Sequence, residues 1–260
     1  MDTESIPGKT IALVVVAFLF LAGVHLWWQG RERNGRNNGE PVIDRARVEG
    51  GDRQITLGER RQGEKERKAR REEMRRLLTI LKQSSDVQAR RSAALRLQYL
   101  ADSSAEPELL KALKSRDEIV ARRCADALLD LWQKSESHSV NRMVERGITA
   151  YENGEFEEAL NRLNMSAELD PDIPDLHRLR AEILLARGEE NAALKAGRKA
   201  LKLESHNFMA HHVMAKAYRR QERGDAALDA VNRAIEVYPG YEPANELKAE
   251  ILSLQKAGEL

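Results

Sequence analysis

The chain has 260 residues, of which 33% are charged and only 5% are aromatic, and its net charge is +1. This composition favours helical repeats over a sheet-based enzyme core, and the balanced net charge does not indicate a general nucleic-acid-binding protein. A single cysteine, Cys124, excludes an internal disulfide and a cysteine-based metal site.

Residues 11–28 form an apolar run that follows a short N-terminal tail, residues 1–10. The run reads IALVVVAFLFLAGVHLWW, which is long enough to cross a bilayer as a helix, and it ends in two tryptophans, which favour the headgroup level. A cleaved signal peptide is the alternative, but the preceding residues are not basic and no small-residue cleavage site closes the run. The sequence therefore predicts a single-pass transmembrane helix.

Basic residues flank this run unequally, and their distribution predicts the topology. Lys9 alone precedes the run, whereas Arg31, Arg33 and Arg36 follow it closely. The positive-inside rule then predicts that the N-terminus lies outside and the C-terminal repeats lie in the cytoplasm. The opposite topology, with the repeats outside, stays open.

Two polar segments follow the apolar run. Residues 29–58 are rich in Gly, Asn and Arg, and they predict a flexible tether because they cannot bury enough apolar surface to fold. Residues 59–76 are densely charged and predict a solvated helix held by i,i+4 ion pairs. The alternatives are contact with anionic lipid and contact with nucleic acid, which is less favoured because no aromatic residues are interleaved for base stacking. The lipid-contact candidates are Arg60, Arg61, Lys65, Arg67, Lys68, Arg70 and Arg71.

Residues 74–135 carry apolar residues at helical spacing. With the preceding charged run they predict four helices, at about 64–83, 86–101, 106–115 and 117–134. The stretch DEIVARRCADALLDL, which follows ELLKALKS, resembles a HEAT-type repeat. We expect Trp132 to pack in the seam with the next array, and we expect one continuous right-handed helical solenoid over residues 74–257.

Residues 140–241 repeat one pattern of small residues every 34 positions. This period predicts stacked two-helix units and a polar-backed closing helix at 242–257. The two helices of the first unit are expected at about 139–152 and 155–169. Turns are expected at Asn153-Gly154, Arg187-Gly188 and Arg223-Gly224. The repeating columns are Gly147, Ala181 and Ala215; Ala159, Ala193 and Ala227; and Ser166, Ala200 and Ala234.

These columns resemble those of the tetratricopeptide repeat (TPR) family over residues 140–254. The early tryptophan column of the family is replaced by Met143, His177 and His211. The resemblance implies an all-α solenoid whose first helices form a concave groove for a peptide or helix of a partner protein. The groove residues that it implies are Val144, Ile148, Tyr151, Arg178, Glu182, Leu185, His212, Lys216 and Arg219.

The groove composition predicts the chemistry of the partner. A known family clamp for C-terminal carboxylates would fall on Val144 and Ile148, so binding of chaperone C-terminal tails is not expected. An apolar first unit and a basic third unit, with Lys216, Arg219 and Arg220, predict a partner segment with an apolar part and an acidic part.

The sequence offers no catalytic motif. The histidines at 177 and 211 occupy an inward packing column, and there is no Gly-rich phosphate loop or metal-ligand spacing. We therefore expect no catalytic residue, no metal and no cofactor, and we predict a membrane-anchored, non-enzymatic scaffold that assists assembly or localisation of a membrane-associated complex. The alternatives are a lipid- or nucleic-acid-associated adaptor acting through residues 59–76 and an outward-facing envelope assembly factor.

Overall fold

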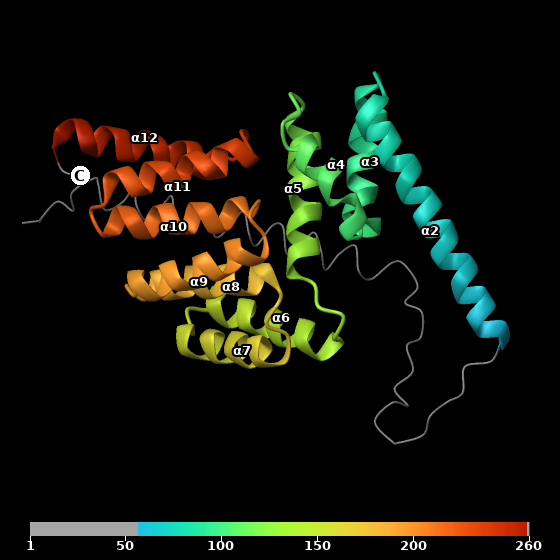
Figure 1. Ribbon diagram of the computed structural model, residues 1–260, viewed down its shortest axis with the longest axis horizontal. Helices are drawn as coiled ribbons and strands as arrows, with labels where there is room; N and C mark the ends of the chain where they lie inside the picture. The colour runs from blue at the N-terminus through green and yellow to red at the C-terminus, as the bar shows by residue number, and fades with distance from the viewer. Residues whose placement is uncertain (1–56, 259) are drawn as a thin grey trace, which may run out of the picture. The chain divides into compact units, whose positions relative to one another are not determined.

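The computed structural model describes residues 57–258 and 260, with side chains from residue 61 onward. This part of the chain is helical and contains no strand (Figure 1). The predicted tail (1–10), the predicted transmembrane helix (11–28) and nearly all of the predicted tether lie outside the described residues. No helix within the described part is long and apolar enough to cross a membrane.

Eleven α-helices follow one another through the described residues, with a 3-10 turn at Ser103–Ala105 after the second. They are α2 (Leu57–Gln83), α3 (Val87–Leu100), α4 (Glu106–Ala112), α5 (Glu118–Gln133), α6 (His138–Glu152), α7 (Phe156–Leu169), α8 (Pro174–Ala186), α9 (Glu190–Leu203), α10 (Phe208–Arg220), α11 (Gly224–Val237) and α12 (Glu242–Ala257).

Helices α2 to α5 form two hairpins. Met74, Leu77 and Leu81 of α2 are buried in the same core as the small and apolar residues of α3 and α5. Arg91 Nε lies 2.9 Å from Asp117 Oδ2, which places the starts of α3 and α5 side by side. Helix α2 runs without a break through the predicted segment boundary near residue 76. The likeness of these hairpins to HEAT repeats stays a prediction.

Helices α6 to α12 form the repeat array that the period predicts. The second helices begin at Phe156, Glu190 and Gly224, each 34 residues after the one before. The three predicted small columns are buried, and a Cβ at Gly147 would lie only 3.1 Å from the Leu163 side chain. Small residues are thus required where the two helices of a unit cross closely. The array resembles a tetratricopeptide solenoid.

One residue near the start of each later first helix hydrogen-bonds back to the preceding loop. His177 Nε2 lies 2.8 Å from the carbonyl oxygen of Pro171, and His211 Nε2 lies 3.1 Å from that of Ser205. Asn245 Nδ2 makes the same contact with the Pro239 carbonyl at 3.0 Å; this column is where the family carries tryptophan. The sequence reasoning expected an inward packing role for these histidines. The structure shows that each donates a hydrogen bond that satisfies a loop carbonyl.

The turns inside the units require a left-handed backbone at one position. Gly154 and Gly188 adopt it with φ of 80° and 78°, as predicted. In the third unit the equivalent residue is Glu222, with φ of 57°, and Gly224 is instead the buried first residue of α11. The prediction that Gly224 is the turn glycine is therefore wrong. A repeat step of 34 residues from Gly188 ends at Glu222.

The structure differs from the continuous solenoid predicted over residues 74–257. Helix α5 packs against α8 and runs across the array instead of stacking on α6 as a further repeat (Figure 1). Trp132 at its end contacts Phe208 of α10 with ring centroids 6.1 Å apart, and Ser135 donates a hydrogen bond to Asp170 at 2.5 Å. Trp132 does reach the array, but at the third unit. Phe208 also contacts Tyr238, with ring centroids 5.3 Å apart, so the end of α5 joins a cluster of aromatic rings in the array.

Candidate protein-interaction groove

The first helices α6, α8 and α10 carry the nine residues implied for the groove. Three of these, Val144, Arg178 and Leu185, are buried, so their side chains are not available to a partner. The remaining six are partly exposed: Ile148, Tyr151, Glu182, His212, Lys216 and Arg219.

A buried ionic cluster lies at the centre of the middle unit. Arg178 donates from Nε and Nη2 to the two carboxylate oxygens of Asp175, at 2.6 and 2.7 Å, and from Nη1 to Glu182 at 2.5 Å. Burial lowers the pKa of the Arg178 guanidinium, but Asp175 and Glu182 outweigh burial and hold that pKa above its usual range. The cluster fixes the rotamer of Glu182, whose side chain stays 20% exposed.

Two tyrosines and a histidine surround this cluster. Burial raises the pKa of the Tyr151 and Tyr241 phenols above their usual range, and the charge of Glu182 adds to this effect. The Tyr241 hydroxyl lies 3.4 Å from His212 Nδ1. Burial, helped by Lys216, lowers the pKa of His212 to about 4, so this ring is neutral at pH 7. The groove centre thus combines a fixed carboxylate with neutral polar rings.

The third unit presents less free positive charge than the sequence predicts. Arg219 Nη1 lies 2.7 Å from Glu250 of α12, and Arg220 donates to the carbonyl oxygen of Leu185. Lys216 makes no ion pair among the residues that the structure describes. One of the three cations expected there is therefore unpaired, because the closing helix and the neighbouring unit engage the other two.

Sequence reasoning missed Asp175 and Tyr241. Asp175 stands three residues before Arg178 on the same helix, a spacing that allows an ion pair, so this partner was detectable. Tyr241 is the residue before α12, and its contact with His212 depends on how the closing helix docks. No sequence spacing reports that docking.

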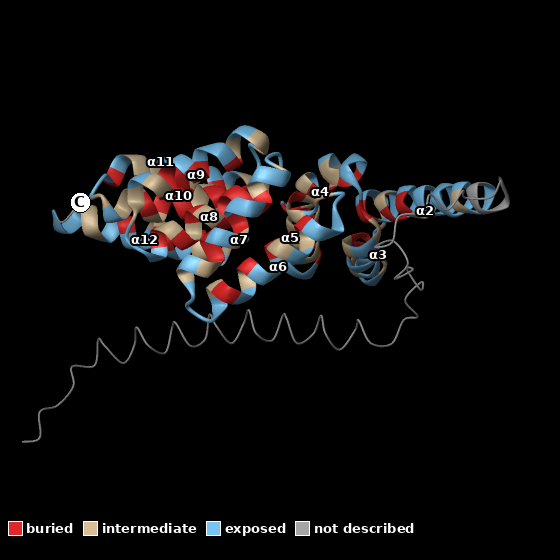
Figure 2. Cartoon of the chain, turned by 90° about the horizontal axis from the view of Figure 1, so that it is seen from below, coloured by how far each residue is buried: buried red, intermediate tan, exposed pale blue. Residues whose placement is uncertain are grey.

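The described lipid-contact candidates lie on the first half of α2. Arg61, Lys65, Arg67, Lys68, Arg70 and Arg71 are all exposed, and Figure 2 shows this half of the helix largely as exposed surface. Arg70 donates from Nη2 to the carbonyl oxygen of Tyr99 at 3.1 Å. The side chain of Arg60 lies outside what the structure describes.

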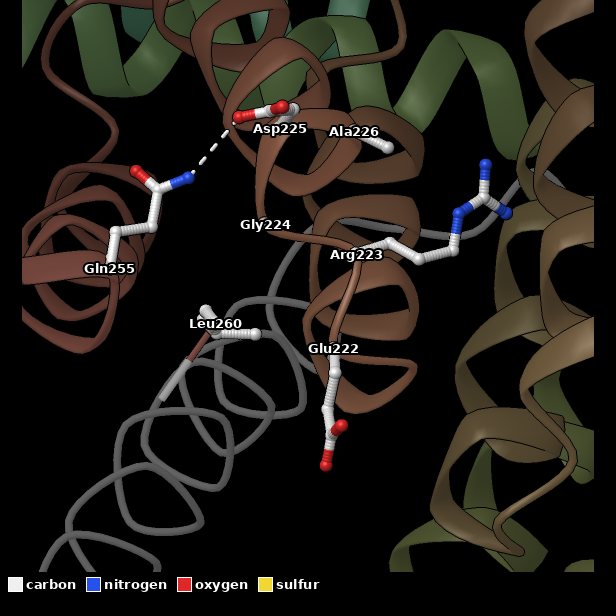
Figure 3. A pocket seen from close by; sticks show the side chains of 7 residues that line it. All are labelled: Glu222, Arg223, Gly224, Asp225, Ala226, Gln255 and Leu260. Atoms are coloured by element: carbon white, nitrogen blue, oxygen red, sulfur yellow. Dashed lines mark hydrogen bonds between the residues drawn. The ribbon is translucent and has the colours of Figure 1, made fainter. Parts of the chain in front are cut away.

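The remaining polar features do not assemble a reactive site in the described residues. No group of three His, Cys, Asp or Glu side chains there is placed to hold a metal. Burial raises the pKa of the Cys124 thiol to about 12, so it is not a nucleophile at pH 7. An open cavity of about 430 Å³ lies between the start of α11 and the end of α12 (Figure 3). Polar residues such as Asp225 and Gln255 line it, and it contains no predicted groove residue.

The fold defines the class: an α-helical repeat protein with a short tetratricopeptide-like array. No protein-family model matches the sequence. A stretch of 117 residues is 26% identical to human protein O-mannosyl-transferase TMTC1. The match covers 44% of this chain but only 13% of TMTC1. The chain thus spans a small part of this relative, and the name of the relative does not carry an activity over to it.

Solved tetratricopeptide domains are also similar in structure. One is the first such domain of Spaghetti (RPAP3), bound to the HSP90 peptide SRMEEVD. The match covers 46% of this chain and 96% of that domain, with a TM-score of 0.45 and 19% identity. The first domain of human RPAP3 covers 47% and 96%, with a TM-score of 0.46 and 20% identity. The Sgt2 domain of Aspergillus fumigatus covers 48% and 84%, with a TM-score of 0.45 and 15% identity. Identities this low carry no information about ligands.

Proposed function

We propose that this protein is a membrane-anchored, non-enzymatic scaffold that recruits a partner protein along the concave face of its repeat array. One observation carries the proposal. Ile148, Glu182 and Lys216 stand one period apart on α6, α8 and α10, and each is partly exposed. The three neighbouring helices therefore present an apolar, an acidic and a basic side chain in a row, which is a pattern suited to reading an extended or helical segment.

The chemistry of the face narrows the partner segment. An apolar side chain of the partner fits against Ile148 and Tyr151 in the first unit. A single carboxylate of the partner fits at Lys216, because Arg219 and Arg220 are already engaged. Glu182 is held in place by Arg178, so a basic or hydrogen-bonding group of the partner would meet a fixed acceptor.

The membrane part of the proposal rests on the sequence. In it, residues 11–28 span the bilayer, residues 29–58 act as a tether, and the repeats face the cytoplasm. Attachment to the bilayer raises the local concentration of any bound partner, which assists assembly or localisation of a complex without catalysis. Protease treatment of sealed native membrane vesicles with the cytoplasmic face outward tests the topology. The proposal expects the repeats to be digested. If the repeats are protected, they lie on the other side of the membrane, which favours the envelope assembly alternative.

Crosslinking of the full chain in its native membrane tests the groove. The double substitution Ile148→Ser with Lys216→Glu changes two partly exposed positions of the face. Lys114→Glu is the matched charge control, because Lys114 is exposed and has no ion-pair partner in the described chain. We expect the parent and the control to recover the same specific protein and the double variant to lose it. Equal recovery by all three would refute the groove.

A second candidate function, contact of α2 with anionic lipid, has its own observation. Arg61, Lys65, Lys68 and Arg75 follow one another at i, i+4, i+7 and i+14, so they lie on one face of the helix, and all are exposed. The i,i+4 ion pairs expected in this run do not form between residues 61 and 72, where the side-chain contacts are a hydrogen bond from Gln62 to Glu66 and one from Arg70 to the Tyr99 carbonyl. Unpaired cations on one face suit a negatively charged bilayer.

A probe on Ala69→Cys tests this contact, because Ala69 is exposed beside the basic stripe whereas Cys124 is buried. The full chain is placed in nanodiscs with or without phosphatidylserine, and quenching by a headgroup-attached quencher is measured. We expect salt-sensitive quenching only with phosphatidylserine, and its loss when the four stripe residues become Glu. Quenching that ignores lipid charge would contradict the contact. Binding of a labelled RNA through the same stripe would favour the nucleic-acid alternative.

A further inference from the structure

Helix α9, the second helix of the middle unit, carries an exposed basic row. Its members stand at i, i+3, i+4 and i+7, so they lie on one helix face, and all four are exposed. Glu190 is the one acidic residue of α9, whereas α7 and α11 each carry three acidic residues and one basic residue. The row consists of Lys195, Arg198, Lys199 and Lys202.

No residue of the basic row has an ion-pair or hydrogen-bond partner among the described residues. The equivalent helices differ: Arg162 of α7 lies 2.6 Å from Glu158, and Arg233 of α11 lies 3.1 Å from Glu236. Like charges four residues apart destabilise a helix, and no ion pair among the described residues offsets the repulsion within the row. The array does not need a full basic row for folding, because Asn161 and Asp229 stand where α9 has Lys195, and Glu168 and Glu236 stand where it has Lys202.

Two exposed apolar side chains flank the row. Met165 and Leu169 at the end of α7 are 43% and 64% exposed. Met165 stands one period before Lys199, so it lies at the same height on the neighbouring second helix. A partner that neutralises the row can therefore also cover these two side chains.

We infer that the α9 basic row, with Met165 and Leu169, is a docking surface for a helical segment of a partner protein that carries acidic residues on one face and apolar residues beside them. Charge complementarity selects an acidic occupant. Exposed carboxylates one period on either side of Lys202, at Glu168 and Glu236, disfavour a broad anionic bilayer surface. A single helix laid along α9 avoids Glu236 and meets only Glu168, which lies beside Met165 and Leu169. This surface lies on second helices and is separate from the concave groove.

A designed peptide tests the inference on the full chain in neutral detergent micelles. The probe is a fluorescent helical peptide with Glu at i, i+3, i+4 and i+7 and two leucines beside that face; a scrambled peptide of the same composition is its control. Fluorescence anisotropy measures the affinity. We expect replacement of the four basic residues by Gln to weaken binding about tenfold or more, since four exposed ion pairs are lost. Met165→Ser with Leu169→Ser should also weaken it.

The matched control replaces Lys82, Lys114, Arg116 and Lys134 by Gln, which removes the same charge from exposed positions outside the row, the groove and the α2 stripe. This variant should keep the parent affinity, and circular dichroism should show that all variants keep the parent helix content. Equal affinity for the scrambled peptide, or an equal loss with the control variant, would overturn the inference. It would also be overturned if the α9 variant lost binding to phosphatidylserine vesicles while the peptide bound neither chain, because the row would then be a lipid contact.

Discussion

Replacing Arg178 by Met tests the buried ionic cluster at the groove centre. The substitution keeps most of the side-chain volume but removes the guanidinium that satisfies both oxygens of Asp175. Asp175 has a side chain only 3% exposed, so water cannot replace the lost partner. Glu182 is 20% exposed and can regain water in part. The variant therefore leaves one carboxylate buried without its cation.

Breaking a buried ion pair in this way costs about 3–5 kcal/mol of the free energy of unfolding. The double variant Asp175→Leu with Arg178→Met removes both charges, and it should recover most of this loss because apolar side chains of similar size replace the pair. The difference between the single and double variants then reports the cost of the orphaned carboxylate.

Urea denaturation followed by circular dichroism measures these free energies on the full chain in detergent. The isosteric control is Lys216→Met, an unpaired cation of the same face, which should change stability by about 0.5 kcal/mol or less. A loss below about 1 kcal/mol for Arg178→Met would refute the reasoning, since it would show that Asp175 is solvated or has another partner.

Substitutions at three further positions test the repeat array and helix α5, which packs against it. Glu222→Gly should stabilise the chain by about 0.5–1 kcal/mol, because the left-handed backbone costs a non-glycine residue about 1–2 kcal/mol and glycine loses more entropy on folding; a lower urea midpoint would contradict this. His177→Ala removes the hydrogen bond to the Pro171 carbonyl and should cost about 1–3 kcal/mol, whereas His177→Asn, the residue type that makes this contact in α12, should cost less. Burial raises the pKa of Asp126 to about 6 from 3.8, so its contribution to stability is complete below about pH 3.8 and is lost as the pH rises to about 6. Asp126→Asn should therefore be more stable than the parent by about 2–3 kcal/mol above pH 7, with no such gain at pH 4; a gain independent of pH would exclude this origin.

The repeat array could be predicted from the sequence because its determinants are local and periodic. The small columns at Ala159, Ala193 and Ala227 fixed both the period and the crossing points of the helices, and all three are fully buried. Asp86 and Asp117 stand at the starts of the predicted helices 86–101 and 117–134, and each carboxylate accepts a hydrogen bond from a backbone N–H two residues later. The helices whose bounds were predicted begin and end within three residues of those bounds, except that α2 begins seven residues before the expected residue 64.

The turn of the third unit shows where the local pattern misleads. Glycine usually supplies a left-handed residue, so Gly224 attracted the prediction. Glu222 adopts that conformation one period after Gly188, whereas Gly224 is the buried first residue of α11, where a Cβ would lie 2.8 Å from Nε2 at the end of the flexible Gln255 side chain. The residue type therefore predicted the left-handed position at Gly224, but the structure has it at Glu222.

The sequence by itself determined the all-helical class, the period and most helix starts, since each depends on neighbours within one unit. Only the tertiary structure decided which charges remain free and how the segments before and after the array dock. Arg219 is paired because α12 brings Glu250 to it, and Trp132 reaches Phe208 because α5 crosses the array. Contacts between units and across the junction join residues far apart in the chain, and no repeat spacing encodes those distances.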